Sequence, residues 1–256
     1  MTTKQQELAT KFAKAHESGD LLVLPTVWDV WSARQAAAAG FPGLTIGSHP
    51  VSEAIGNSDG EDMNFDHYLM VAKQIAELID IPVSLDVESG YGLPADELME
   101  KVLATGVVGV NIEDVVHGEG DRVRSREEHA EYIRLARKTV DEAGVDLVIN
   151  GRTDAVDLGT DEFDDPMGEA IARIELMVAA GARAVYPVGI TTAADISTVV
   201  AATDVPVNVT VSPTEGTDAG NYPELKELGV RRVTFGPKWQ MALEEASQKM
   251  LKPWLG

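Results

Sequence analysis

The feature that most constrains the fold of this 256-residue chain is an alternation of short apolar runs with longer amphipathic stretches, repeated eight times. The apolar runs are rich in Val, Ile and Leu and lie at 21–24, 44–46, 83–85, 108–112, 147–150, 184–186, 207–209 and 233–235. Such nearly unbroken runs are typical of parallel strands that are covered on both faces. The stretches between them have a helical period and lie at 31–39, 65–78, 95–104, 126–142, 166–179, 193–201, 223–227 and 239–250. Eight strand–helix units predict a (β/α)8 TIM barrel of the α/β class, a fold whose usual size is about 250 residues.

An open, doubly wound sheet is the alternative α/β fold. That fold usually carries a glycine-rich phosphate-binding turn after its first strand, and here the first run leads into Pro25, Thr26, Val27 and Trp28. No low-complexity stretch and no Pro/Ser-rich linker divides the chain. We therefore expect a single barrel domain over residues 1–256, in which residues 1–20 form an extra helix before the first strand.

Charge and cysteine content exclude several classes of partner and chemistry. The chain has 21 Lys plus Arg against 42 Asp plus Glu, a net charge of −21, which argues against nucleic acid and anionic membranes as partners. No apolar run is long enough to span a bilayer, and the first residues lack the apolar centre of a secretory signal. The absence of cysteine excludes disulfides, thiolate metal sites and a cysteine nucleophile. We expect a cytoplasmic protein.

Acidic residues follow two neighbouring runs, at the positions where a barrel of this kind keeps its active site. Asp86 and Glu88 come at the end of the third run, and Glu113 follows the fourth. Carboxylates that converge repel one another unless a cation or a proton lies between them. Oxygen ligands without a nearby cysteine suit a hard ion such as Mg²⁺. The alternative is that these are solvated loop residues of a very acidic protein.

Arg152, after the fifth run, balances this negative charge. A guanidinium can hold a substrate carboxylate or phosphoryl group with two parallel hydrogen bonds. The alternative is a structural ion pair with Asp154 or Glu113. The turn at Gly47 and Ser48 offers backbone N–H groups that could bind an anion.

The five histidines show no HxxxH or HxH spacing, so a histidine zinc site is not expected. His49 follows the second run and is a candidate proton shuttle, although a surface or structural histidine explains it equally well.

Several segments, in this order, resemble the isocitrate lyase/phosphoenolpyruvate mutase superfamily and in particular its smaller phosphonomutase-like members. They are Asp29–Arg34 with Ala39–Phe41, Gly56–Asp59, Asp86–Gly92 (DVESGYG), Asn111–Asp114 (NIED), Gly151–Ala155 (GRTDA) and Glu227–Val233 before Gly236-Pro237. The resemblance extends over roughly residues 20 to 240, and the combination of the DVESGYG, NIED and GRTDA motifs at this spacing is specific.

The resemblance implies a (β/α)8 barrel whose last helix is often exchanged between subunits of a homodimer or homotetramer. It implies Mg²⁺ or Mn²⁺, a small 2-oxo or 2-hydroxy carboxylate substrate, and cleavage or rearrangement of a C–C or P–C bond through a pyruvate enolate held on the metal. The implied metal ligands are Asp86 directly and Asp59, Glu88 and Glu113 through water. The implied substrate-binding groups are Arg152, the backbone of Gly47 and Ser48, and Asn208. The resemblance and the positions of these residues after the apolar runs together make Arg152, Glu113 and His49 the candidate catalytic residues.

The segment 115–124 departs from the family pattern. The lyases carry a Lys-x-Cys-Gly motif there and the mutases a Lys-x-Asn motif, and this segment has neither Lys nor Cys. His117, Arg122 and Arg124 could act as lid groups or could be solvated loop residues. Val188 stands where relatives often have Glu or His. Isocitrate or methylisocitrate cleavage by the usual route is therefore not expected.

Two classes of function stay open at this point. One is a Mg²⁺-dependent enzyme, either a C–C lyase or decarboxylase or a P–C mutase or hydrolase. The alternative is a catalytically silent barrel that binds a small carboxylate as a sensor or structural subunit. A Schiff-base aldolase is disfavoured, because Lys238 is the only lysine near a strand end. The tryptophans Trp239 and Trp254 in the apolar C-terminal stretch suggest a partner surface, and hence a homo-oligomer.

Overall fold

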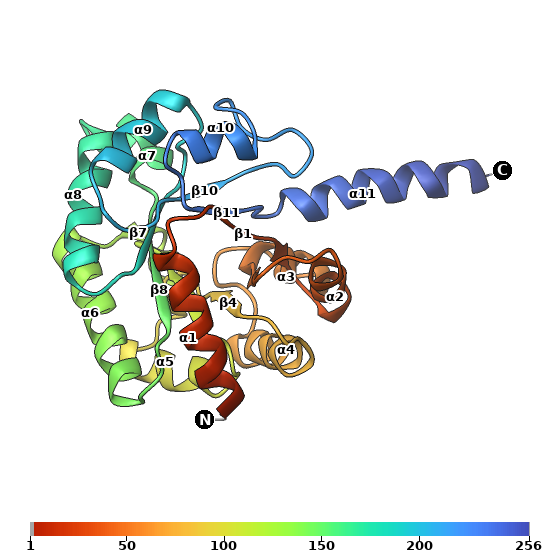
Figure 1. Ribbon diagram of the computed structural model, residues 1–256, viewed down its shortest axis with the longest axis horizontal. Coiled ribbons are helices and arrows are strands. Elements are labelled where there is room, and N and C mark those ends of the chain that lie inside the picture. Colours follow the sequence, from red (N-terminus) through yellow and green to blue (C-terminus); the bar gives the residue numbers. More distant parts are fainter. Residues whose placement is uncertain (1–2, 256) are drawn as a thin grey trace.

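The computed structural model describes residues 3–255 and contains eight parallel strands that close into a barrel within a layer of helices (Figure 1). In order around the barrel, the strands are β1 (Leu22–Leu24) continued by β2 (Thr26–Val27), β3 (Leu44–Ile46), β4 (Val83–Asp86), β5 (Gly109–Ile112), β8 (Val148–Thr153), β9 (Ala184–Pro187), β10 (Asn208–Thr210) and β11 (Arg232–Thr234). The ring closes because β11 pairs in parallel with β1, and Val185 and Val207 form a parallel bridge between the β9 and β10 segments. The predicted (β/α)8 barrel is confirmed.

The first barrel strand is divided at Pro25, so that β1 pairs with β11 while β2 pairs with β3. Proline has no N–H group and cannot donate to a strand ladder, which is why a break at this position is favoured. The bounds of β3 agree with its apolar run, and those of the other strands differ from theirs by at most three residues.

The helices follow the expected stretches closely. They are α1 (Thr3–Glu17), α2 (Val30–Ala38), α4 (Phe65–Leu78), α5 (Ala95–Leu103), α6 (Arg126–Glu142), α8 (Pro166–Ala179), α9 (Ala193–Ala201), α10 (Tyr222–Glu227) and α11 (Lys238–Leu251). Capping residues fix several of their starts. Asp29 accepts a hydrogen bond from the Ser32 N–H at 2.7 Å before α2, and Ser125 and Glu128 form a capping box at α6.

Four short elements were not expected from the sequence. They are α3 (Ser48–Ile55), the hairpin strands β6 (Val115–Val116) and β7 (Arg122–Val123), and α7 (Ala155–Leu158). Single 3₁₀ turns lie at His117–Glu119, Gly159–Asp161 and Lys252–Trp254. The four short elements follow β3, β5 and β8, so they lie where residues at the carboxyl ends of the strands build the site.

Helix α1 packs against the opposite, amino-terminal ends of the strands. Phe12 is 1% exposed, and a Cβ at Gly109 would lie only 2.6 Å from its ring. Glycine at the start of β5 therefore lets α1 approach the barrel. Among residues 3–255, we find no helix with the length and apolar character that crossing a bilayer requires.

Helix α11 leaves the barrel and projects away from it (Figure 1). None of its residues is buried. Trp239 at its base packs edge-to-face on Trp28, with ring centroids 5.2 Å apart, whereas Met250 and Trp254 are 67% and 88% exposed. The apolar side chains at this end of the chain thus lack a covering surface within one copy.

Candidate active site

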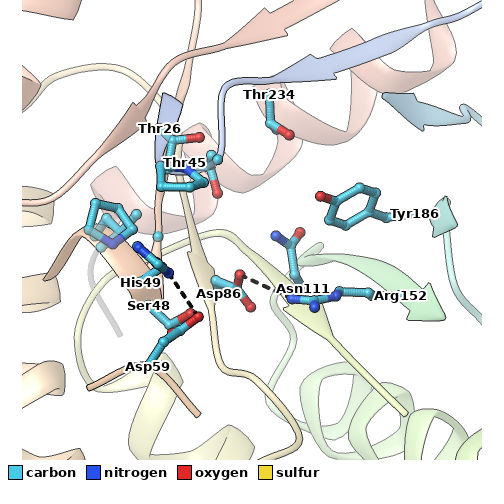
Figure 2. A pocket seen from close by; sticks show the side chains of 15 residues that line it. Thr26, Thr45, Ser48, His49, Asp59, Asp86, Asn111, Arg152, Tyr186 and Thr234 are labelled. Carbon is cyan, nitrogen blue, oxygen red and sulfur yellow. Dashed lines mark hydrogen bonds and ion pairs between the residues drawn. The ribbon is translucent and has the colours of Figure 1, made fainter. Parts of the chain in front are cut away.

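A cavity of about 170 Å³ lies at the carboxyl ends of the barrel strands, lined by residues of the strands and of the segments that follow them (Figure 2). Its polar lining consists of Thr26, Thr45, Ser48, His49, Asp59, Asp86, Asn111, Arg152, Tyr186 and Thr234. The Thr45 hydroxyl is buried and has no hydrogen-bond partner among the described residues. Buried polar atoms are rarely left unpaired, so this cavity is suited to a polar ligand.

Three of the predicted metal ligands lie close together at the ends of β4 and β5. Asp86 ends β4, and Glu88 and Glu113 follow β4 and β5 with 2% and 1% exposure. Glu88 is fixed by two hydrogen bonds. The Tyr91 hydroxyl donates to Oε1 at 2.5 Å and the Glu61 N–H donates to Oε2 at 2.6 Å. The Glu88 backbone has φ of 48°, a left-handed conformation that is uncommon for a residue with a side chain.

This carboxylate cluster is not fully neutralised by the protein. Burial raises the pKa of Asp86 to about 7, with a further increase from Glu113, even though Arg152 acts in the opposite direction. Burial also raises the pKa of Glu88 to about 8, and the neighbouring Glu113 and Asp86 add to the shift. A divalent cation among these carboxylates would relieve their mutual repulsion and would displace the protons as it binds. The donor set thus fits a hard metal ion.

Arg152 on β8 connects the cluster to the cavity. Its Nη1 lies 2.5 Å from Glu113 Oε2, and its Nε and Nη2 donate to the two oxygens of Asp154 at 2.7 and 2.6 Å. The structural ion pairs considered as an alternative are therefore present. They use three of the five guanidinium N–H groups, and because Arg152 also lines the cavity, the others are available to a bound carboxylate.

His117 joins the cluster from the turn between β6 and β7. Its Nε2 lies 2.8 Å from Glu113 Oε1 and its Nδ1 lies 2.7 Å from Asp121 Oδ1. The hydrogen bond with Glu113 raises the pKa of His117 to about 10, against the effect of partial burial. One ligand atom each from Glu88, Glu113 and His117 lie within 4.8 Å of one another, which defines a candidate metal site. Sequence reasoning noted His117 only as a lid group, although its i,i+4 spacing from Glu113 was a usable signal.

The other two lid candidates have different roles. Arg122 is exposed and pairs with Glu119 and Glu128 on the surface. Arg124 is held against backbone, because it donates to the carbonyl oxygens of Glu113 and Ser89 at 3.2 and 2.9 Å. Neither residue lines the cavity.

Asp59 and His49 form the outer edge of the cavity. Asp59 Oδ2 lies 3.1 Å from His49 Nδ1, and both side chains are nearly half exposed. His49 lies in the first turn of α3, whereas it was expected in a loop. The structure thus brings Asp59 to the same cavity as Asp86, with His49 beside it.

The start of α3 corrects one expectation about the anion-binding turn. The Gly47 N–H donates to the Val27 carbonyl at 3.1 Å, so it is already used. Glycine at position 47 instead allows the backbone to pack closely against the Thr26 side chain, because a Cβ there would lie 2.6 Å from Thr26 Cγ2. The next N–H along the chain, that of Ser48, belongs to the first turn of α3, where helix geometry provides no internal partner.

Asn208 does not lie at the cavity. It is fully buried at the start of β10, where its Oδ1 accepts a hydrogen bond from Arg232 and its Nδ2 donates to Thr234 Oγ1. Sequence reasoning missed Asn111 and Tyr186, which do line the cavity. For Asn111 there was a signal, since it stands two residues before Glu113 and alternate strand residues share a face.

The fold and the site together define a class, namely (β/α)8 barrel proteins with a carboxylate cluster that could hold a metal ion and an arginine at the strand ends. Within that class, the family model described as phosphoenolpyruvate phosphomutase matches residues 12–254, and the chain belongs to this family. The predicted resemblance is confirmed.

The relatives include lyases and a phosphonomutase. A crystal structure from Burkholderia cenocepacia J2315, described as a phosphonomutase, superposes with a TM-score of 0.87 and is 34% identical, covering 96% of this chain and 99% of its own. The oxaloacetate decarboxylase of Rhodopseudomonas palustris (strain ATCC BAA-98 / CGA009) is 30% identical over 91% of this chain and 81% of its own length. The 2-methylisocitrate lyase of Bacillus subtilis (strain 168) is 24% identical over 97% and 82%, respectively. The expected class of lyase or mutase agrees with these relatives.

Proposed function

We propose that this protein is a Mg²⁺- or Mn²⁺-dependent lyase that breaks a C–C bond of a small 2-oxo acid and releases a pyruvate-type product. Oxaloacetate, the substrate named for one relative, is our first candidate. The observation that carries the proposal is Arg152, which lines a small cavity beside the partly buried carboxylate of Asp86 and the buried one of Glu113. A cavity of about 170 Å³ is smaller than the roughly 300–1,000 Å³ of sites for drug-sized ligands, and suits an acid of a few carbons.

Charge favours C–C over P–C chemistry at this site. A phosphonate adds up to two negative charges to those of the substrate carboxylate, next to a cluster that is already incompletely neutralised. Arg152 is the only Arg or Lys among the residues that line the cavity. A dicarboxylate demands less positive charge, and loss of CO₂ lowers the negative charge of the organic product.

The residues have separable roles in this proposal. Asp86 would bind the metal directly, with Asp59, Glu88 and Glu113 holding its water ligands, and the ion would supply positive charge that draws electrons from the bond being broken. Arg152 and the Ser48 N–H would hold the substrate carboxylate and orient the scissile bond. His49 would exchange protons with solvent at the outer edge.

The test is pyruvate release, with Mg²⁺, from oxaloacetate, methylisocitrate, oxalomalate and phosphonopyruvate. We expect turnover of oxaloacetate that is lost with chelator and in Asp86→Ala, but kept in the matched surface control Asp66→Ala. Oxalate with Mg²⁺ should raise the melting temperature of the wild type but not that of Asp86→Ala. A shift with oxalate but no turnover of any substrate would favour the catalytically silent barrel. Release from phosphonopyruvate alone would move the assignment to the P–C bond.

We also propose that α11 is exchanged between copies in a homodimer or homotetramer. Its exposed apolar side chains support this, as does an apolar cavity of about 280 Å³ lined by Val23, Val233 and Phe235 on β1, β11 and the residue that follows β11. Light scattering after size-exclusion chromatography should give a dimer or tetramer, and Leu251→Asp with Leu255→Asp should lower the assembly state. A monomeric wild type would contradict the proposal. A cytoplasmic location stays a prediction.

A further inference from the structure

Tyr186, on β9, forms part of the cavity wall that the proposed metal and carboxylate contacts leave unused. Figure 2 shows its hydroxyl end pointing into the cavity, with Asp59 and His49 toward the other side. The hydroxyl lies 2.5 Å from Thr210 Oγ1, and the ring lies 5.7 Å from the Arg152 guanidinium carbon. Two neighbours from two other strands thus fix where this hydroxyl points.

The proposed reaction requires a proton at this end of the cavity. When the C–C bond of a 2-oxo acid breaks, the electron pair stays on the pyruvate-type fragment as an enolate, whose carbon must then gain one proton. If the carboxylate binds the Ser48 N–H and Arg152, Asn111 and Tyr186 are lining residues left to face the rest of the acid, Tyr186 with its ring 5.7 Å from the Arg152 guanidinium carbon. The proton donor should therefore be on that wall.

The other titratable donors near the site are poorly placed for this step. His49 is paired with Asp59 at the outer edge, nearly half exposed and on the opposite side of the cavity. His117 is hydrogen-bonded at both ring nitrogens, to Glu113 and Asp121, and does not line the cavity. The threonine and serine hydroxyls of the wall are much weaker acids than a phenol.

We infer that Tyr186 is the catalytic proton donor to the enolate carbon, a role that rests on the proposed lyase function. In this step the phenol O–H bond breaks, a C–H bond forms at the enolate carbon, and a phenolate is left that recovers its proton from water. The Thr210 hydroxyl, by donating to the phenolate oxygen, and the positive charge of Arg152 stabilise that phenolate. Burial raises the pKa of Tyr186, so the hydroxyl carries its proton at neutral pH.

A donor fixed on one wall makes a stereochemical prediction. If Tyr186 delivers the proton, it reaches one face of the enolate only. With 3-methyloxaloacetate in D₂O, the holoenzyme should give 2-oxobutyrate that carries deuterium at C3 in a single configuration. An enolate that is released and protonated by water gives a racemic product.

The experiment compares the Mg²⁺-loaded wild type with Tyr186→Phe, and measures both the rate and the configuration at C3 by NMR after derivatisation with a chiral reagent. We expect roughly a 10²-fold lower kcat in Tyr186→Phe, the usual scale for losing a general acid, and a racemic product. The oxalate-induced rise in melting temperature should be kept, because the ring and Arg152 remain. Thr210→Val should lower kcat less and keep the single configuration.

Two further variants decide between donors. Tyr222→Phe, at an exposed tyrosine on α10, is the matched control and should behave as wild type. His49→Gln should keep the single configuration at C3. A single configuration in Tyr186→Phe, or a racemic product in wild type or in His49→Gln, would overturn the inference while the lyase function stands. Absence of turnover in the wild type would overturn both.

Discussion

Two charged regions of the barrel interior differ in how their charges are compensated. At the carboxyl ends of the strands, Asp86, Glu88 and Glu113 gather more negative charge than Arg152 and His117 offset, and the carboxyl pKa values rise. Deeper in the barrel, the fully buried Arg232 has no carboxylate within 4.0 Å among the described residues. Its burial lowers its pKa to about 9, a shift that attraction to Asp86 only partly opposes.

The difference lies in hydrogen bonding. Arg232 is satisfied by neutral partners, since it donates to Asn208 and Asn111 and contacts His16 Nε2 at 3.0 Å. The three guanidinium nitrogens of Arg232 thus all have a partner without any ligand, although Asn150 Oδ1, on the next amide of the network, has none among residues 3–255. The carboxylate region, in contrast, contains the Thr45 hydroxyl, unpaired within the described part of the chain, and an open cavity. Its carboxyl groups also hold protons that a cation would displace. An incompletely satisfied group of charges thus marks the functional end of the barrel, and a satisfied one marks its structural interior.

The largest effect is expected from Asp86→Asn in the carboxylate region. Removing an oxygen of the proposed metal ligand should lower the rate of pyruvate release more than 10³-fold, which is about 4 kcal/mol in the activation free energy. The metal-free variant should be at least as stable as the wild type at about pH 8. The reason is that the pKa of Asp86 is higher in the folded than in the unfolded chain, so its charge destabilises the fold above pH 7. Activity assays and urea unfolding measure the two effects. Loss of both activity and stability would mean that Asp86 is a structural residue.

Arg232→Met tests the other region. The substitution leaves buried acceptors on Asn208 and His16 without their donor and removes one of the two donors to Asn111 Oδ1. We expect a loss of roughly 3 kcal/mol or more in the free energy of unfolding. Urea unfolding should show it, with Arg134→Met on the surface as the control, within about 0.5 kcal/mol of wild type. If Arg232→Met were as stable as its control, the network would be dispensable, and Asn208 would be free to serve the site.

The sequence predicted a site residue correctly where the end of its strand could be located. Apolar runs indicated all eight strands, and the strand-end rule found Asp86, Glu113 and Arg152 because their motifs stand just after the runs. Asn208 shows where this fails, since the run at 207–209 could not say whether β10 ends at Asn208 or at Thr210. A shift of two residues moves a side chain about 6.6 Å along the strand, from the cavity into the barrel interior.

The functional residues that were missed depend on contacts between distant segments. Tyr186 lies within an apolar run, so the sequence predicts that it is a core residue. Only the structure shows its contacts with Thr210 and Arg152. The Gly47 N–H donates to the Val27 carbonyl because β2 pairs with β3. Local sequence patterns do not predict such contacts between distant segments.

Acid unfolding should reveal the interior region. Burial lowers the pKa values of His16 and His129 to about 3, from the ordinary 6.5. Below about pH 6.5 the unfolded chain binds protons at these positions that the folded chain does not, so the free energy of unfolding should fall as the pH is lowered from 6.5 toward 3. Urea unfolding at about pH 7 and pH 5 measures this slope, which His16→Gln should reduce. An unchanged slope would mean that His16 titrates normally in the fold.

The carboxylate region should show the smallest and opposite effect. The folded chain binds protons on Asp86 and Glu88 more tightly than the unfolded chain, so their contribution to stability is lost as the pH rises through about 7 and 8. A divalent cation competes with those protons. The rise in melting temperature produced by a fixed concentration of Mg²⁺ should therefore be larger at about pH 8.5 than at pH 6, by a few degrees, and Asp86→Asn should reduce the difference. Scanning calorimetry at the two pH values gives the comparison. A rise independent of pH would place the cation away from Asp86 and Glu88, and the high pKa values of this cluster would then reflect burial without a metal-binding role.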